Sequence, residues 1–178
     1  MTRSEKMLTQ PNIDRIIRVN QAGEHGATRI YAGQLAVLKN STIRSTLKEM
    51  EAQEIEHLKV FNELAVEHSI SPTIFQPIWH VGGYLLGTAT ALLGEKAAHA
   101  CTIAVEEVIA DHYQKQLDEL SDAQNGELKA TIARIREEEI AHKDHAIDEG
   151  GLQAPAYETI TATVKFICKT AIWLSKRV

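Results

Sequence analysis

The chain has 178 residues, of which 44% are hydrophobic and 5% aromatic, and its formal net charge is −5 at neutral pH. This length and apolar content are typical of one globular domain with a single core. The acidic balance argues against a nucleic-acid-binding protein, which would need a basic face. Four prolines and few aromatic residues favour an all-helical chain over a sheet protein.

The N-terminal end and the two thiols bear on location and redox state. Residues 1–12 lack the apolar core of a secretory signal. We expect residues 1–11 to be a flexible tail of a single domain that spans residues 1–178. Cys101 and Cys168 have no Cys-x-x-Cys partner, so we expect neither a sulfur-ligated iron centre nor a disulfide framework. A reducing compartment is the simplest interpretation.

Hydrophobic periodicity predicts four long helices arranged as two antiparallel hairpins, with a further helix packed outside them. Short polar turns at residues 39–41 and 121–126 close the hairpins, and Gly150-Gly151 ends the fourth helix. The expected helices cover residues 12–38, 42–68, 95–120, 127–149 and, for the outer one, 155–176. The predicted fold is therefore an all-α four-helix bundle with an extra C-terminal helix.

Each half of the chain carries one glutamate followed by a Glu-x-x-His pair. The pair starts 30 residues after the lone glutamate in the first half and 33 residues after it in the second. The two residues of a pair lie at i and i+3, so both project from one helix face. The turn between brings the lone glutamate level with them, because helices rise about 1.5 Å per residue. The set comprises Glu24, Glu54, His57, Glu106, Glu139 and His142.

Metal ions would make such a cluster tolerable. A bare carboxylate in a core is strongly destabilising, and four would repel one another. Two divalent cations would match the four carboxylate charges, and the ligand set is that of di-iron and di-manganese bundles. Oxygen-rich ligands with one histidine per metal favour iron or manganese over zinc. We therefore expect these six residues to bind two iron ions, rather than to be solvated charges.

Further polar residues are assigned by their place on the helices. Tyr31 and Tyr113 each follow a lone glutamate by seven residues, two turns along the same face. They either lie beside the metal or serve only as core residues. His112 and His145 either orient ligands or have solvent-facing and packing roles. Glu107 flanks the core face. The glutamates predicted to be surface charges are Glu49, Glu51, Glu56, Glu63, Glu137 and Glu138.

The connection between the hairpins is unusually apolar. Between residues 72 and 104 the only formal charges are Glu95 and Lys96. Its apolar run, residues 79–94, is shorter than the roughly 20 residues that a membrane-spanning helix needs. One interpretation is a buried crossover between the two halves of the bundle. The other, which we prefer, is an apolar surface that lies on a membrane or guides a greasy substrate to the iron.

Several segments around the six residues have distinctive sequences. Residues 20–34 read NQAGEHGATRIYAGQ, residues 53–59 read QEIEHLK and residues 61–64 read FNEL. In the second half, residues 104–113 read AVEEVIADHY and residues 137–144 read EEEIAHKD. Together they resemble the demethoxyubiquinone hydroxylase family, the penultimate-step monooxygenases of ubiquinone biosynthesis, and the resemblance spans nearly all of residues 13–176.

The resemblance implies a ferritin-like fold and two irons held by the same six residues. It implies hydroxylation of a polyprenylated 3-methyl-6-methoxy-1,4-benzoquinol, demethoxyubiquinol, with O2 and with NADH as reductant, used near His112 and Tyr113. It also implies a peripheral membrane enzyme, on the cytoplasmic face of a bacterial cell membrane or the matrix side of the inner mitochondrial membrane. Further copies of the chain or an accessory protein of the pathway are the other expected partners, and nucleic acid is not expected.

Two departures from the family and three alternatives stay open. The leader of mitochondrial members is absent, which favours a bacterial origin, and Asp111 stands where some members place another histidine. The sequence has no Gly-x-Gly-x-x-Gly dinucleotide fingerprint. The alternatives are a ferritin-like ferroxidase or iron-storage protein, another di-iron enzyme such as a tRNA hydroxylase or a peroxidase, and a metal-free helical bundle.

Overall fold

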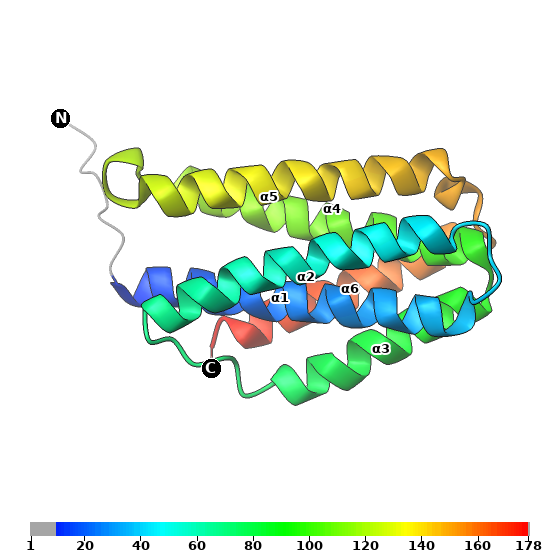
Figure 1. Ribbon diagram of the computed structural model, residues 1–178, viewed down its shortest axis with the longest axis horizontal. Helices are drawn as coiled ribbons and strands as arrows, with labels where there is room; N and C mark the ends of the chain where they lie inside the picture. Colours follow the sequence, from blue (N-terminus) through cyan, green and yellow to red (C-terminus); the bar gives the residue numbers. More distant parts are fainter. Residues whose placement is uncertain (1–9, 178) are drawn as a thin grey trace.

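The described part of the chain is almost entirely helical (Figure 1). The structure is a computed structural model, and it describes residues 10–177. Two turns join the helices into hairpins, and a short 3-10 helix, η1 (Gly151–Gln153), precedes the last helix. The helices are α1 (Gln10–Val37), α2 (Arg44–Glu67), α3 (Gln76–Leu92), α4 (Glu95–Glu119), α5 (Asp122–Asp148) and α6 (Tyr157–Ser175). This confirms the predicted all-α fold.

The two predicted hairpins are present, and each is covered by one further helix. α1 packs against α2, α4 packs against α5, and α1 also contacts α4. α3 lies along α1 on the outside of the bundle, and α6 packs mainly against α4 (Figure 1). This arrangement is consistent with a ferritin-like bundle whose crossover and C-terminal helix lie outside the four core helices.

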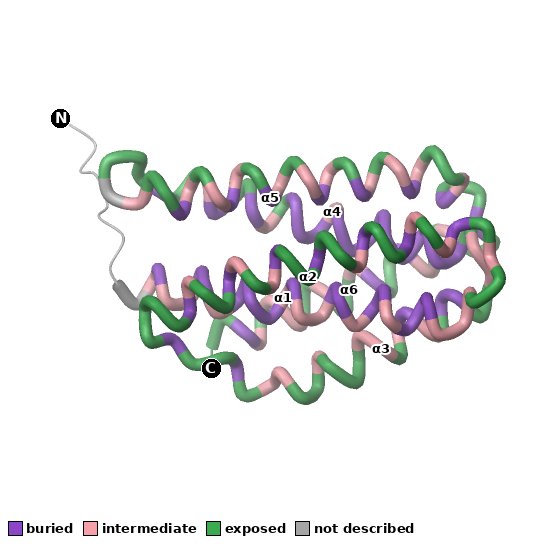
Figure 2. The backbone as a smooth tube through the Cα atoms, in the orientation of Figure 1, coloured by how far each residue is buried: buried purple, intermediate pink, exposed green. Residues whose placement is uncertain are grey.

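Polar residues separate two apolar clusters inside the bundle. On α2, Met50 belongs to one cluster and Phe61 to the other, and Glu54 and His57 lie between them. Glu54 and His57 are 0% and 2% exposed, and Figure 2 shows the buried positions on the inward faces of the helices. The fold thus places ionisable side chains at mid-height in an otherwise apolar interior.

Most helix ends lie within three residues of those predicted, and one does not. α5 begins at Asp122, inside the predicted turn 121–126, and its backbone is non-helical at Asn125 (φ −134°, ψ 28°). The chain therefore bends inside the first turns of α5 instead of forming an open loop. Residues 1–9 of the predicted tail lie outside the described residues, and α1 begins at Gln10.

The connection between the hairpins is itself a helix, α3, which the sequence reasoning did not predict. Glycines let its backbone lie against α1: a Cβ on Gly87 would be 1.9 Å from the Ile30 carbonyl oxygen, and one on Gly33 would be 2.2 Å from the Tyr84 carbonyl oxygen. The outward face carries Ile78, Val81, Leu85 and Leu92, each 57% exposed or more. The interpretation of this segment as a buried crossover is therefore wrong, and an exposed apolar surface is present instead.

Candidate metal centre and adjoining cavity

The structure brings all six predicted ligand residues together. They form two groups of four, and in each group the ligand atoms lie within 4.8 Å of one another. Glu54 and Glu139 belong to both groups. Glu24 and His57 complete the first, and Glu106 and His142 complete the second, each residue being 4% exposed or less. Two shared and four unshared ligands are the arrangement that a pair of metal ions requires.

Both imidazoles turn the same ring nitrogen toward the cluster. His57 Nδ1 lies 3.1 Å from Glu139 Oε1, 3.7 Å from Glu54 Oε2 and 3.8 Å from Glu24 Oε2. His142 Nδ1 lies 3.1 Å from Glu54 Oε1 and 3.3 Å from Glu139 Oε2. Nδ1 is therefore the atom that each histidine can offer to a metal, and Nε2 points away.

The outward nitrogens contact the opposite half of the chain. His57 Nε2 lies 2.6 Å from Glu138 Oε2, and His142 Nε2 contacts Gln53 Oε1. A carboxylate only accepts hydrogen bonds, so a neutral His57 donates from Nε2 and keeps the Nδ1 lone pair free. The amide oxygen of Gln53 does the same for His142. These contacts orient both rings for coordination.

The inward-facing atoms fit two cations. Buried polar atoms in proteins are almost always hydrogen-bonded, yet eight atoms of the six residues have no hydrogen-bond partner among the described residues. They are Glu24 Oε2, both carboxylate oxygens of Glu54 and of Glu139, Glu106 Oε2, and Nδ1 of His57 and of His142. Metal ions would satisfy all of them at once, with the carboxylate-rich donor set that iron accepts.

Protons balance the charges when no metal is bound. Burial, and then repulsion by Glu139 and Glu54, raises the pKa of Glu24 well above its usual value, and burial likewise raises that of Glu106. Burial opposes ionisation of Glu54, but His142 and His57 outweigh it and lower its pKa to about 2.

Both histidines in the cluster hold protons strongly. Burial disfavours their charged forms, but the adjacent carboxylates of Glu139 and Glu54 prevail, raising the pKa of His57 to about 11 and that of His142 to about 9. The cluster therefore needs positive charge, and metal ions would supply it by displacing these protons.

Two tyrosines hold the unshared glutamates. Tyr31 Oη donates to Glu106 Oε1 over 3.0 Å, and Tyr113 Oη donates to Glu24 Oε1. Burial, followed by repulsion from the nearby carboxylates, raises the pKa of both phenols, so both stay protonated donors. Both hydroxyl groups therefore lie beside the cluster of six residues.

The two further histidines lie outside the cluster. The ring of His112 stacks on Tyr113, and its Nε2 lies 2.9 Å from Nε2 of Gln116, which exchanges hydrogen bonds with Asn20. Burial, and then Lys176 and Lys115, lower its pKa to about 4, which keeps the imidazole neutral. His145 is half-buried near Glu149, at 4.0 Å. His112 thus borders a residue that touches a ligand, while His145 joins neither group.

An apolar cavity of about 340 Å³ reaches the ligand-bearing helices. It lies between α1, α3, α4 and α6, and its wall includes Gly23, which precedes Glu24, and Val105, which precedes Glu106. At the outside, Ile78 of α3 and Ile167 of α6 line it while being 57% and 42% exposed. The cavity therefore reaches the apolar outer surface of α3 and α6, and its wall includes residues directly before Glu24 and Glu106 in the sequence.

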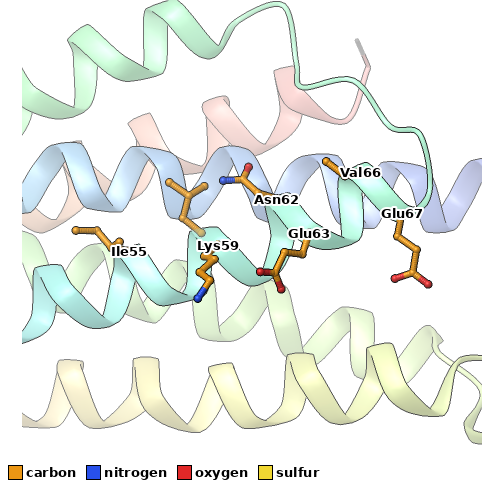
Figure 3. Close-up of a pocket in the computed structure, with 7 residues that line it drawn as sticks. Ile55, Lys59, Asn62, Glu63, Val66 and Glu67 are labelled. Carbon is orange, nitrogen blue, oxygen red and sulfur yellow. The ribbon is translucent and has the colours of Figure 1, made fainter.

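A second hollow has no connection with the cluster. It measures about 550 Å³, is shallow, and lies on the outer side of α2, where Figure 3 shows its side chains. Glu54 and His57 point into the bundle from the same helix and do not line it. The lining residues are Ile55, Leu58, Lys59, Asn62, Glu63, Val66 and Glu67.

Comparison with known proteins identifies the family. Residues 11–175 match the family described as ubiquinone biosynthesis protein COQ7. The chain belongs to the COQ7 family. It is 51% identical over 167 residues to the 3-demethoxyubiquinol 3-hydroxylase of Rhodospirillum rubrum, a match that covers 93% of this chain and 78% of that protein.

Eukaryotic relatives of this COQ7-family chain carry related names. The human NADPH-dependent 3-demethoxyubiquinone 3-hydroxylase, mitochondrial, is 44% identical over 173 residues, covering 96% of this chain and 80% of that protein. The Dictyostelium discoideum protein of the same name is 48% identical over 176 residues, covering 98% and 81%. The predicted family resemblance is thus confirmed along almost the whole chain.

Sequence reasoning missed two residues of this COQ7-family site. Glu138 was predicted to be only a surface charge. Its side chain is 38% exposed, but its carboxylate also contacts His57, a contact that the prediction did not include. Gln53 drew no prediction. Each directly precedes a ligand glutamate, Glu54 or Glu139, in its half of the duplication. That shared offset is the signal that could have identified them.

Proposed function

We propose that this protein is a di-iron monooxygenase that hydroxylates the ring of a polyprenylated demethoxyubiquinol with O2, in ubiquinone biosynthesis. The observation that carries the proposal is the pair of four-residue ligand groups sharing Glu54 and Glu139, next to an apolar cavity. The names of relatives that match more than nine-tenths of this chain support the same substrate class.

The six residues would hold the two irons, and bound iron would supply the redox chemistry for which protein side chains are unsuited. Glu54 and Glu139 would bridge the two positions, and the other four residues would each serve one position. Tyr31 and Tyr113 donate to the unshared glutamates and so fix which carboxylate oxygen remains for a metal. The buried surroundings exclude bulk water from the cluster.

The cavity would position the substrate. Its volume suits a substituted benzoquinol ring, and its almost wholly aliphatic wall offers a hydrophobic environment for an isoprenoid chain. Because it opens between α3 and α6, the ring would enter while the tail stays outside, against the exposed apolar residues of these helices.

Peripheral membrane attachment through this surface would give access to such a lipid. No helix among residues 10–177 is both long and apolar enough to cross a bilayer. α3 has no formally charged residue, and α6 presents exposed Phe166 and Trp173, with Arg177 stacked 3.5 Å from the Trp173 ring centroid. Apolar, aromatic and basic side chains together are typical of helices that lie at a membrane surface.

We propose reduced nicotinamide as the electron source. Several eukaryotic relatives are named NADPH-dependent and mitochondrial, whereas the sequence resemblance implied NADH. Tyr113 and the neutral His112 next to it form the side of the site where electrons would enter. We also infer that the described helices form one domain.

Isotope labelling tests the proposed reaction. Iron-loaded protein is supplied with a demethoxyquinol in detergent, a reductant and 18O2, and the quinone product is analysed by mass spectrometry. One 18O atom in the new hydroxyl group is expected, and none when the label is in water. A product without label from 18O2, or no product while iron is fully loaded, would contradict the proposed function.

Vesicle flotation tests the membrane surface. Val81→Asp on α3 should reduce binding to phospholipid vesicles severalfold. The control is Ile55→Asp on α2, where the apolar side chain is 51% exposed compared with 57% for Val81, but lies on the other side of the bundle. Equal loss in both variants, or in neither, would refute attachment through α3.

A further inference from the structure

The candidate metal centre has an internal two-fold pattern with one break. Tyr31 from the first half holds Glu106 of the second, and Tyr113 from the second half holds Glu24 of the first. The residue before each shared glutamate likewise contacts the histidine of the other half. These partners are Gln53 for His142 and Glu138 for His57, separated in sequence by 89 and 81 residues. The positions match, but one partner is an amide and the other a carboxylate.

The carboxylate is held in place. Arg134, one helical turn earlier on α5, donates from Nη1 to Oε1 and Oε2 of Glu138, at 2.9 Å and 3.0 Å. Glu138 accepts from His57 Nε2 over 2.6 Å with the same Oε2. Gln53, by contrast, is an exposed and uncharged amide.

The chemistry of the two acceptors is unequal. A carboxylate that accepts a hydrogen bond from the outer nitrogen of a metal-binding imidazole makes the inner nitrogen a stronger electron donor. A neutral amide orients the ring with a weaker electronic effect, because charge-assisted hydrogen bonds are roughly twice as strong as neutral ones. Each group consists of three glutamates and one histidine, so this pair of partners is the main difference in donor strength between the two positions.

We propose that Glu138, fixed by Arg134, is a positioning residue that makes the two metal positions unequal. The position formed with Glu24 and His57 binds its metal more tightly and fills first, and the position formed with Glu106 and His142 fills second. This inference rests on the proposed di-metal function and adds to it an order of loading.

Stepwise metal addition tests the order. Metal-free protein receives Co2+ anaerobically, and the visible absorption and magnetic circular dichroism of the bound ion are recorded. The wild-type chain should bind Co2+ in two phases. Glu138→Gln should weaken the affinity of the first phase by about 10–100-fold, which is the usual effect of removing a hydrogen-bond partner of a metal-binding histidine, so that the two phases merge. Gln53→Glu should instead tighten the second phase.

Four variants make the assignment specific. Glu137→Gln is the matched control and should leave both phases unchanged, because the Glu137 carboxylate bonds to Arg136 and its side chain is 70% exposed. Tyr113→Phe should alter the spectrum of the ion bound first, and Tyr31→Phe that of the ion bound second. In the doubly exchanged variant, Gln53→Glu with Glu138→Gln, these two spectral effects should trade places.

The outcomes separate this inference from the proposed function. If wild-type protein binds no Co2+ at the cluster, the di-metal site itself fails. If it binds two ions in one phase, or if Glu138→Gln and Glu137→Gln behave alike, the site stands and the inequality fails. If Glu138→Gln does not fold, Gln53→Glu is compared with the wild-type protein instead. An unchanged second phase of Co2+ binding in Gln53→Glu would then overturn the proposal.

Discussion

The close packing of α3 on α1 can be tested with two glycine substitutions in the same helix. A Cβ at Gly87 would lie 1.9 Å from the oxygen, 2.8 Å from the carbonyl carbon and 3.0 Å from the Cα of Ile30, all backbone atoms that cannot rotate away. A Cβ at Gly82 would meet nothing within 4 Å. Gly87→Ala therefore forces α3 away from α1, and Gly82→Ala does not.

The difference between the two variants isolates the clash. Replacing glycine by alanine inside a helix stabilises it by about 1 kcal/mol, and this gain applies to both variants. Overpacking costs about 1–3 kcal/mol and applies only at Gly87. Gly87→Ala should thus be less stable than Gly82→Ala by about 1–3 kcal/mol, which corresponds to roughly 2–12 °C in melting temperature for a domain of this size.

Thermal unfolding of the metal-free proteins, followed by far-ultraviolet circular dichroism, measures that gap. Gly87→Ala should also raise KM for the quinol, because α3 forms one wall of the cavity, while iron content stays at the wild-type level. Equal melting temperatures for the two alanine variants would show that α3 does not pack against α1 as described. They would also contradict the description of the cavity, because α3 forms one of its walls.

Three further predictions concern the cluster and the cavity. Glu139→Ala removes a ligand shared by both groups, so iron content and turnover should fall together in elemental analysis and quinol assays; full activity would remove Glu139 from the site. Gly26→Leu, on the cavity wall where a Cβ meets nothing within 4 Å, should raise KM severalfold with iron content unchanged, and an unaltered KM would place the substrate elsewhere. In the metal-free protein, the pKa values of His142 and His57 are raised to about 9 and about 11. The protonated imidazoles therefore stabilise the folded protein. This stabilisation is complete below the ordinary histidine pKa of 6.5 and is lost as the pH rises through the two raised values. The melting temperature should therefore be lower near pH 10 than near pH 7, and a melting temperature that rises toward pH 10 would contradict the raised histidine pKa values. Metal affinity should instead fall on acidification, because protons compete with the metal for the ligand atoms.

The six clustered residues were predictable because metal chemistry constrains sequence as well as structure. Burying four carboxylates demands a fixed ligand set, and helix geometry converts that set into spacings that recur in both halves of the chain. One hairpin turn separates Glu24 and Glu106 from the Glu-x-x-His pair in the same half of the chain. The positions of the turns and the helical rise per residue were therefore enough to predict that these residues lie at the same height. The tyrosines followed from the same periodicity.

The remaining features depend on contacts that a single helix does not reveal. Glu138 looks like a solvated charge on α5, and only the packing of α2 beside α5 brings His57 to it across 81 residues of sequence. The segment of α3 was predicted only as an apolar connection, and its glycines Gly82, Gly83 and Gly87 lower helix propensity. Gly83 and Gly87 instead allow close contact with α1, which stabilises α3 in the fold.

The most direct test of the metal centre is Mössbauer spectroscopy of the protein loaded with 57Fe, together with its iron content. We expect two irons per chain, magnetically coupled through shared carboxylates, with both the stoichiometry and the coupling lost in Glu139→Ala. Iron that binds at one per chain or less, or two irons without magnetic coupling, would contradict a centre in which Glu54 and Glu139 serve both metal ions.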